Sequence, residues 1–272
     1  MHLVSLNITN VTFGEVNELG HRDNYLLWVE AYSADGAIGL GRSNASVPVY
    51  TDTKVPTILS SIVSQGVLDK TIMTLDLPRN THKIGSIYLG MIPDEVSKSD
   101  QIRVPFSHST SDALVNTWQV RLDNLSVKGS GTTSTEISDL YATLTADMWT
   151  SLPKQIYNQT LEALGATNGL YNFGQFVLPT YDCSLWGAMP DLIFTFAGTD
   201  IALTEEDYSW RGSFPSGAEH TCAVFLQENE FDSKAVSVGT ELLRKFYVVF
   251  DMDNDELRRE HARYEDDSRE VC

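Results

Sequence analysis

The sequence predicts a mainly β fold, and two observations support this. Short runs of residues alternate apolar and polar side chains with period 2, a pattern typical of half-buried strands. Gly, Pro and Asn separate one run from the next, as they do at turns. The expected strands cover residues 3–12, 26–32, 71–77, 118–127 and 192–196.

Helical signals are scarce, and they point to two short surface helices. Residues 55–65 carry a proline suited to a first helical turn and are followed by Gly66. Residues 153–164 repeat this arrangement before Gly165. Proline near the start and glycine just past the end are the expected boundaries of a helix.

Composition and charge exclude several classes of protein. The chain has 272 residues with 19 basic and 37 acidic side chains, a net charge of −18. This charge opposes a phosphate backbone and no basic run is present, so we expect no nucleic-acid partner. No apolar stretch reaches the roughly 18 residues of a membrane helix, so we expect no membrane association. At about 150 residues per domain, the length favours two lobes.

Searches for catalytic and metal-binding motifs return almost nothing. The sequence contains no G-x-S-x-G, no H-E-x-x-H and no G-x-x-x-x-G-K-[ST]. Asp251, Asp253 and Asp255 have the spacing that opens a calcium loop, but Glu256 stands where glycine is needed and Ala262 where a bidentate Glu should be. We therefore expect no metal and no cofactor, and interpret the charged residues 256–272 as a solvated tail.

Cysteines and glycosylation sequons suggest a secretory protein. Three cysteines allow one disulfide and one leftover thiol, without a C-x-x-C pair. The N-terminal residues show neither the charged nor the apolar region of a signal peptide, so we expect that this chain has none of its own. N-x-[ST] sequons, which accept glycans in secreted proteins, occur at Asn7, Asn10, Asn44, Asn124 and Asn158.

Several segments, in order along the chain, resemble one family. Residues 35–41 (DGAIGLG) are similar to the D-G-[IV]-[LM]-G-L-G segment of pepsin-like aspartic endopeptidases, the peptidase A1 family, of the fungal type. Residues 85–90 (GSIYLG) resemble its G-x-[LI]-x-[FL]-G strand pair, and Trp118 resembles the Trp-centred strand that opens its second lobe. Residues 239–251 (GTELLRKFYVVFD) are similar to its closing segment.

The resemblance implies a bilobal acid-protease fold acting on peptide or protein substrates. It suggests a truncated N-terminal lobe at residues 1–115, a near-complete C-terminal lobe at 116–255 and the charged tail at 256–272. It also implies a disulfide between Cys183 and Cys222, with Cys272 unpaired, and a secreted or vacuolar location. A lobe without its leading strands exposes an unpaired edge, so we expect the N-terminal part to be partly unfolded or paired with another chain.

Members of this family take one aspartate from a D-[TS]-G-[TS] loop in each lobe, and the sequence contains neither D-T-G nor D-S-G. The resemblance places the second loop before residues 152–153. Aligned without gaps, the aspartate position falls on Leu144. With three residues deleted, Asp147 takes that position and Trp149 replaces the glycine. Asp147 is the candidate catalytic residue of the second alignment.

The chemistry requires two carboxylates about 3 Å apart that share one proton, one to activate water and the other to polarise the scissile carbonyl. One carboxylate cannot perform both tasks. We therefore expect a homologue that does not hydrolyse peptide bonds by itself. Two alternatives remain: an acid endopeptidase completed by upstream sequence or a partner chain, and a peptide-binding pseudoenzyme.

Overall fold

The computed structural model describes residues 38–42, 56–78, 84–94, 96, 101–107, 117–128, 140–147, 149–173, 176–211, 221–229 and 234–261. The chain divides into two compact units, one of Met1–Asp69 with Thr110–Thr117 and the other of Lys70–Ser109 with Trp118–Cys272. The expected strands at residues 3–12 and 26–32, and most of the 35–41 segment, lie outside the described residues.

In the first unit, the described residues form helix α2 (Ile58–Ser64). Thr57 caps its N-terminus, because its hydroxyl accepts a hydrogen bond from the Ser60 N–H over 3.2 Å. Gly66 has a φ of 62° just beyond the last turn, a conformation that costs glycine little. The helix expected at residues 55–65 is therefore present.

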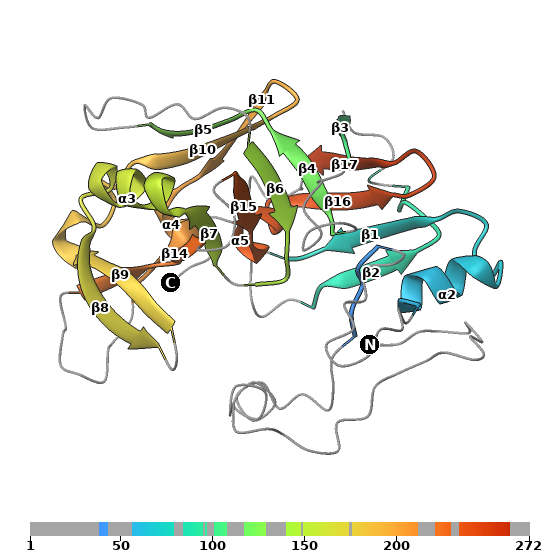
Figure 1. Ribbon diagram of the computed structural model, residues 1–272, viewed down its shortest axis with the longest axis horizontal. Coiled ribbons are helices and arrows are strands. Elements are labelled where there is room, and N and C mark those ends of the chain that lie inside the picture. Colours follow the sequence, from blue (N-terminus) through green and yellow to red (C-terminus); the bar gives the residue numbers. More distant parts are fainter. Residues whose placement is uncertain are drawn as a thin grey trace, which may run out of the picture. The chain divides into compact units, whose positions relative to one another are not determined.

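In the second unit, a five-stranded antiparallel sheet unites segments far apart in the sequence (Figure 1). Its order is β2-β1-β16-β17-β3, so the C-terminal hairpin β16–β17 lies between β1 and β3. The sheet thus includes strands from both sides of the lobe boundary expected near residue 116. The strands are β1 (Ile72–Asp76), β2 (Ser86–Leu89), β3 (Gln101–Pro105), β16 (Phe246–Asp251) and β17 (Glu256–His261).

A second five-stranded sheet of the same unit, β14-β7-β15-β6-β4, contains two parallel pairs. Strand β15 runs parallel to β6, and β14 runs parallel to β7, whereas β4 is antiparallel to β6. Helix α3 (Lys154–Ala163) follows β7 directly. The strands are β4 (Gln119–Leu122), β6 (Leu140–Leu144), β7 (Thr150–Pro153), β14 (Leu226–Asn229) and β15 (Ala235–Val238).

The described residues of this unit also form two smaller antiparallel sheets, β11-β10-β5 and β12-β13-β9-β8. Their strands are β5 (Asn124–Lys128), β8 (Thr167–Phe173), β9 (Phe176–Asp182), β10 (Asp191–Phe196), β11 (Thr199–Leu203), β12 (Ser209–Trp210) and β13 (Thr221–Val224). Short helical turns connect them: η1 (Cys183–Leu185), α4 (Glu205–Tyr208) and α5 (Thr240–Leu243).

Trp118 anchors the junction between these sheets. Its ring is buried and lies 4.6 Å from Phe250 and 5.4 Å from Phe106, measured between ring centroids. Phe106 also forms a bridge with Val120 of β4. Tilted aromatic pairs at these distances stabilise a core beyond the area that they bury, so Trp118 is a core residue.

The mainly β prediction is confirmed. The alternating runs at residues 71–77 and 192–196 correspond to β1 and β10, and the run at 118–127 divides into β4 and β5. The helix expected at 153–164 is α3. Burial does not alternate strictly in these strands, because Ile72 to Thr74 of β1 and Leu192 to Phe194 of β10 are buried in succession. Both strands were predictable as short apolar runs bounded by turn residues.

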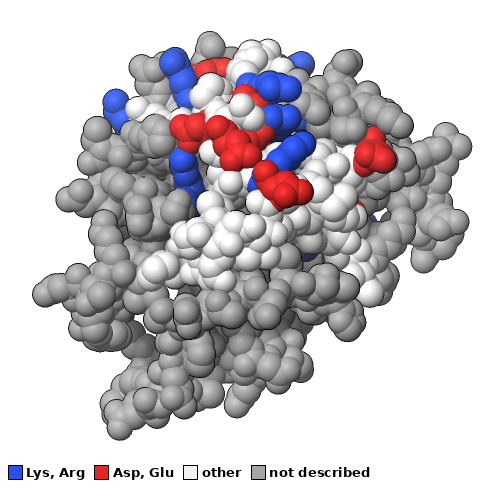
Figure 2. Space-filling view, turned by 90° about the vertical axis from the view of Figure 1, so that its right-hand side faces the viewer, with Lys and Arg blue, Asp and Glu red and all other residues white. Residues whose placement is uncertain are grey.

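Part of the expected solvated tail is instead a central strand, which corrects that interpretation for residues 256–261. Strand β17 pairs with β16 on one side and β3 on the other. Its Leu257 is buried, and its Glu256 and Arg258 form ion pairs within the sheet. Acidic and basic side chains mix on one face of the molecule instead of forming separate patches (Figure 2). The charges of this strand pair with protein groups, which a count of charged residues does not reveal.

Candidate active site

The loop of residues 145–149 connects β6 to β7 and begins beside strand β15. Parallel pairing of β15 with β6 sets Val238 opposite Leu144, and the Thr145 N–H donates to the Val238 carbonyl oxygen over 3.0 Å. Beyond the loop, Ser151 of β7 lies opposite Ser237 of the same strand. Both ends of the loop are therefore fixed to β15.

Gly239, the residue after β15, makes a close backbone approach to this loop. A Cβ atom built there would lie 2.5 Å from the Trp149 carbonyl oxygen and 2.6 Å from that of Asp147. The next residue, Thr240, donates its N–H to the Asp147 carbonyl oxygen over 2.7 Å. Only glycine permits this approach, so the loop and the end of β15 form one backbone-linked unit.

The two candidate positions for the second-lobe aspartate have different environments. Leu144, the candidate of the ungapped alignment, is buried at the end of β6 with 7% of its surface exposed. Asp147, the candidate of the gapped alignment, is exposed, and its backbone N–H donates to the Thr145 hydroxyl over 3.4 Å. The two candidate positions are thus a buried side chain that cannot ionise, at the end of β6, and a carboxylate exposed to solvent in the loop.

Among the described residues, three carboxylates are buried: Glu205, Asp207 and Asp251. The Oδ2 atom of Asp207 lies 2.6 Å from the Lys245 ammonium and accepts hydrogen bonds from the backbone and hydroxyl of Thr204. This is the capping box of α4. The T-x-x-D spacing at residues 204–207 is a signal that sequence reasoning could have used to find it.

Glu205 holds the loop that follows the disulfide. No sequence motif predicted that this carboxylate would be buried. Its carboxylate accepts from the Tyr181 hydroxyl and from the Gly187 N–H, both over 2.6 Å. Burial, followed by the hydrogen bond to Glu205, raises the pKa of Tyr181 well above its usual value. Burial, followed by the charge of Glu205, likewise raises the pKa of Tyr208, whose hydroxyl donates to the Pro190 carbonyl over 2.6 Å. Glu205 therefore has a structural role.

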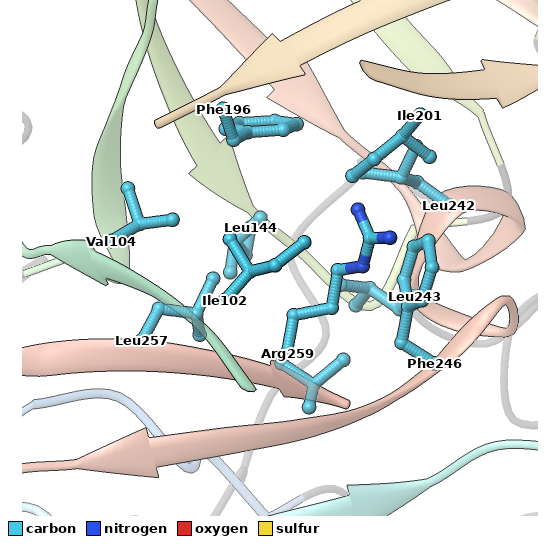
Figure 3. A pocket seen from close by; sticks show the side chains of 11 residues that line it. Ile102, Val104, Leu144, Phe196, Ile201, Leu242, Leu243, Phe246, Leu257 and Arg259 are labelled. Carbon is cyan, nitrogen blue, oxygen red and sulfur yellow. The ribbon is translucent and has the colours of Figure 1, made fainter. Parts of the chain in front are cut away.

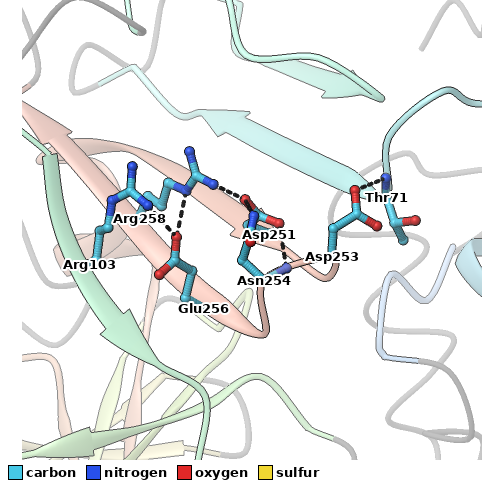
Figure 4. A network of polar contacts seen from close by, with 7 residues as sticks. All are labelled: Thr71, Arg103, Asp251, Asp253, Asn254, Glu256 and Arg258. Atoms are coloured by element: carbon cyan, nitrogen blue, oxygen red, sulfur yellow. Dashed lines mark hydrogen bonds and ion pairs between the residues drawn. The ribbon is translucent and has the colours of Figure 1, made fainter.

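The acidic run considered as a calcium loop binds protein donors instead (Figure 4). Asp251 is completely buried, and it accepts from the backbone and side chain of Asn254 over 3.0 and 2.8 Å and from Arg258. The Oε1 atom of Glu256 accepts hydrogen bonds from Nε of Arg258 over 2.9 Å and from Nη1 of Arg103 over 3.1 Å. Within the part of the chain that the structure describes, no group of three or more His, Cys, Asp or Glu side chains could hold a metal ion.

Cys183 and Cys222 form a disulfide, the pair that the family resemblance implies. Cys183 opens η1, and Cys222 lies opposite Tyr181 where β13 pairs with β9. The bond spans a sequence separation of 39 residues. In the chain-entropy model, a loop of this size contributes roughly 3 to 4 kcal/mol to stability.

Two of the five glycosylation sequons fall on described residues. Asn158 is exposed on α3, whereas Asn124 is half-buried on β5 with its Oδ1 atom buried. Asn7, Asn10 and Asn44 lie outside the described residues, as does Cys272. In the described part of the chain, no helix has the length and apolar character that crossing a membrane requires.

Comparison with known proteins identifies the family to which this sequence is similar. Residues 1–260 match the eukaryotic aspartyl protease family. The chain is 26% identical to renin of Canis lupus familiaris over 250 residues, 90% of this chain and 56% of renin. It is 24% identical to secreted aspartic protease 9 of Candida albicans over 267 residues (95% and 46%), and 28% identical to aspartic protease 1 of Caenorhabditis elegans over 229 residues (82% and 53%). The chain spans about half the length of the curated relatives that it matches.

Proposed function

Because the chain belongs to the eukaryotic aspartyl protease family, we propose that it is a pepsin-like aspartic endopeptidase homologue that does not hydrolyse peptide bonds by itself. One observation carries this proposal. Where the resemblance expects the second aspartate, the described residues are a buried Leu144 at the end of β6 and, in the loop that follows, the exposed carboxylate of Asp147.

The reaction explains why this loss is decisive. Hydrolysis needs a charged carboxylate to activate water and a protonated carboxyl group to polarise the carbonyl, held close enough to share a proton. Correctly placed acid–base groups contribute about 10² to 10⁴ in rate. A side chain without a carboxylate cannot enter the pair, and a carboxylate in solvent is not held in near-contact geometry.

The test is an assay of the full chain with casein and haemoglobin across acidic pH, with and without pepstatin. We expect no cleavage above a blank. Asp147→Asn is the matched variant, because it removes the carboxylate and preserves the shape. Cleavage that pepstatin inhibits would overturn the proposal, and its loss in Asp147→Asn would then identify Asp147 as catalytic.

The second candidate is an acid endopeptidase completed by further sequence or by a partner chain. The observation in its favour is that the relatives are about twice as long as the matched region. Reading the transcript upstream of Met1 tests it. An upstream D-[TS]-G and signal peptide would support this candidate, and an untranslated region with neither would remove its main support.

We also propose a secreted location, or a vacuolar one as the family resemblance implies. One relative is named a secreted aspartic protease, and the Cys183–Cys222 disulfide suits an oxidising compartment. If the chain enters that route, Asn158 is the described sequon most open to a glycan, because its side chain is exposed. Peptide mass mapping after deglycosylation in heavy-oxygen water detects the modified asparagine.

Pairing with another chain is proposed at β2. This strand is the edge of its sheet among the described strands, and the apolar side chains of Ile84, Ile87 and Met91 on and beside it are exposed by 95%, 37% and 51%. An exposed edge with apolar side chains is a template for strand addition. Light scattering of Ile87→Lys against the unmodified chain tests this, and an unchanged mass would contradict it.

A further inference from the structure

A small apolar cavity lies between strands β3, β17 and helix α5. Its volume is about 30 Å³. The apolar side chains around it include Leu144 at the end of β6, Ile201 of β11 and Leu242 of α5. Figure 3 shows the guanidinium of Arg259 pointing in among these side chains. The lining residues include no carboxylate.

Arg259 enters this cavity because of its place in β17. It lies opposite Val248 of β16 and Ile102 of β3, both of which also line the cavity. Its guanidinium carbon stands 3.8 Å from the centroid of the Phe246 ring. The Nε and Nη1 atoms are buried and have no hydrogen-bond acceptor.

The neighbouring arginine shows what Arg259 lacks. Arg258, on the opposite face of the strand, has Asp251 and Glu256 as partners. Burial lowers the pKa of Arg259 to about 10, so the side chain still carries its positive charge at pH 7. A buried charge without an acceptor is costly unless a counter-charge or another acceptor is supplied. The Phe246 ring offers only part of that compensation.

We propose that this cavity binds one small monovalent anion, a halide or a carboxylate the size of formate, at Nε and Nη1 of Arg259. The size follows from the volume, because about 10 to 15 Å³ is needed for one water molecule and the cavity therefore holds only a few atoms. The charge follows from the Nε and Nη1 atoms of the half-buried Arg259, which are buried without an acceptor. The apolar walls exclude strongly hydrated multivalent anions, which would lose their hydration without replacement donors.

The overall charge of the chain implies that anion binding would depend on the local surroundings of Arg259. A net charge of −18 repels anions from the molecule as a whole. Non-specific anion binding is therefore disfavoured, and a saturable stabilisation by a halide indicates binding at a particular site. Among the described residues, Arg259 is the arginine whose buried nitrogens lack acceptors.

The first experiment measures the melting temperature of the full chain while sodium bromide replaces the sodium salt of a bulky sulfonate at constant ionic strength. Bound bromide should raise the melting temperature saturably, by roughly 3 °C at about ten times its dissociation constant. Arg259→Leu should abolish this dependence. Arg121→Leu is the matched control, because that arginine is 66% exposed, and it should retain the dependence.

The second experiment locates the ion without a variant. Crystals of the full chain grown with bromide should show an anomalous peak in the cavity, in contact with the Arg259 guanidinium. Formate should compete for the same position and lower the peak. A cavity that is empty or holds only water at saturating bromide overturns the proposal, as does an Arg259→Leu protein that responds to bromide like the unmodified chain.

Discussion

The Thr240 N–H donates to the Asp147 carbonyl oxygen over 2.7 Å, so the loop with the candidate carboxylate is fixed to the residue that follows Gly239. This bond uses the backbone of Asp147 and leaves its side chain exposed. The loop is thereby held in place by contacts that do not depend on catalytic side chains. The contacts that hold this loop therefore do not involve the Asp147 carboxylate.

Gly239→Ala should disrupt that arrangement. The added Cβ would stand 2.5 Å from the Trp149 carbonyl oxygen, a backbone atom that cannot move alone. Overpacking of this kind costs about 1 to 3 kcal/mol, and we expect the upper part of that range in urea unfolding. Gly39→Ala is the control, because a Cβ there meets nothing within 4 Å. Equal stability of the two variants would contradict the close approach.

Asp251→Asn should destabilise the protein by about 3 kcal/mol, because it removes the fully buried carboxylate of the ion pair with Arg258 and leaves Glu256 as that arginine's remaining counter-charge. Lys154→Met provides the comparison. The Lys154 ammonium lies 3.1 Å from Glu228, but the lysine side chain is 73% exposed, and breaking such a surface pair costs less than about 1 kcal/mol. Chemical denaturation of both variants would distinguish the buried ion pair from the exposed one. Similar losses of unfolding free energy in the two variants would contradict the prediction.

Alkaline pH should weaken the fold through Tyr181 and Tyr208. Burial raises the pKa of both above the unfolded value near 10, so the stabilisation is fully present below pH 10 and is lost as pH rises above it. At pH 7, Tyr208→Phe should lower the free energy of unfolding by about 1 kcal/mol, because it removes the hydrogen bond to the Pro190 carbonyl oxygen. The difference between this variant and the unmodified chain should shrink above pH 10. A constant difference from pH 7 to 11 in urea titrations would argue against a buried, titrating hydroxyl.

Replacing Cys183 and Cys222 together with serine should lower stability by roughly 3 to 4 kcal/mol, because the unfolded chain regains the freedom of the closed loop. Unfolding in urea, compared with the unmodified chain under oxidising conditions, measures the loss. Cys272→Ser is the control and should change little. If the double variant matches this control, the bond does not constrain the unfolded chain.

The sequence predicted those elements whose stabilising contacts are repeated locally. Strands β1 and β10 are short runs rich in apolar residues, and α3 begins after a proline and ends before a glycine. Such signals lie within the segment itself. The family resemblance added the pairing of Cys183 with Cys222, which local pattern alone left open.

The rest depends on partners far along the chain. Glu256 pairs with Arg103, 153 positions away, so a charged segment that suggests a solvated tail becomes a strand inside a sheet. The burial of Glu205 likewise depends on donors from Tyr181 and Gly187, which no local spacing encodes. At the candidate site, the alignment gave Asp147 as the candidate with three residues deleted and Leu144 without gaps, and local pattern alone does not decide between the two registers.

Strand β17 also bears on how the gene could be shortened for expression. A stop codon after residue 255 would delete only charged-looking sequence, yet it would leave β16 and β3 without the neighbour that each now has on that side. The two strand edges exposed in this way would favour association between copies of the chain. A boundary placed after His261 retains the whole ladder.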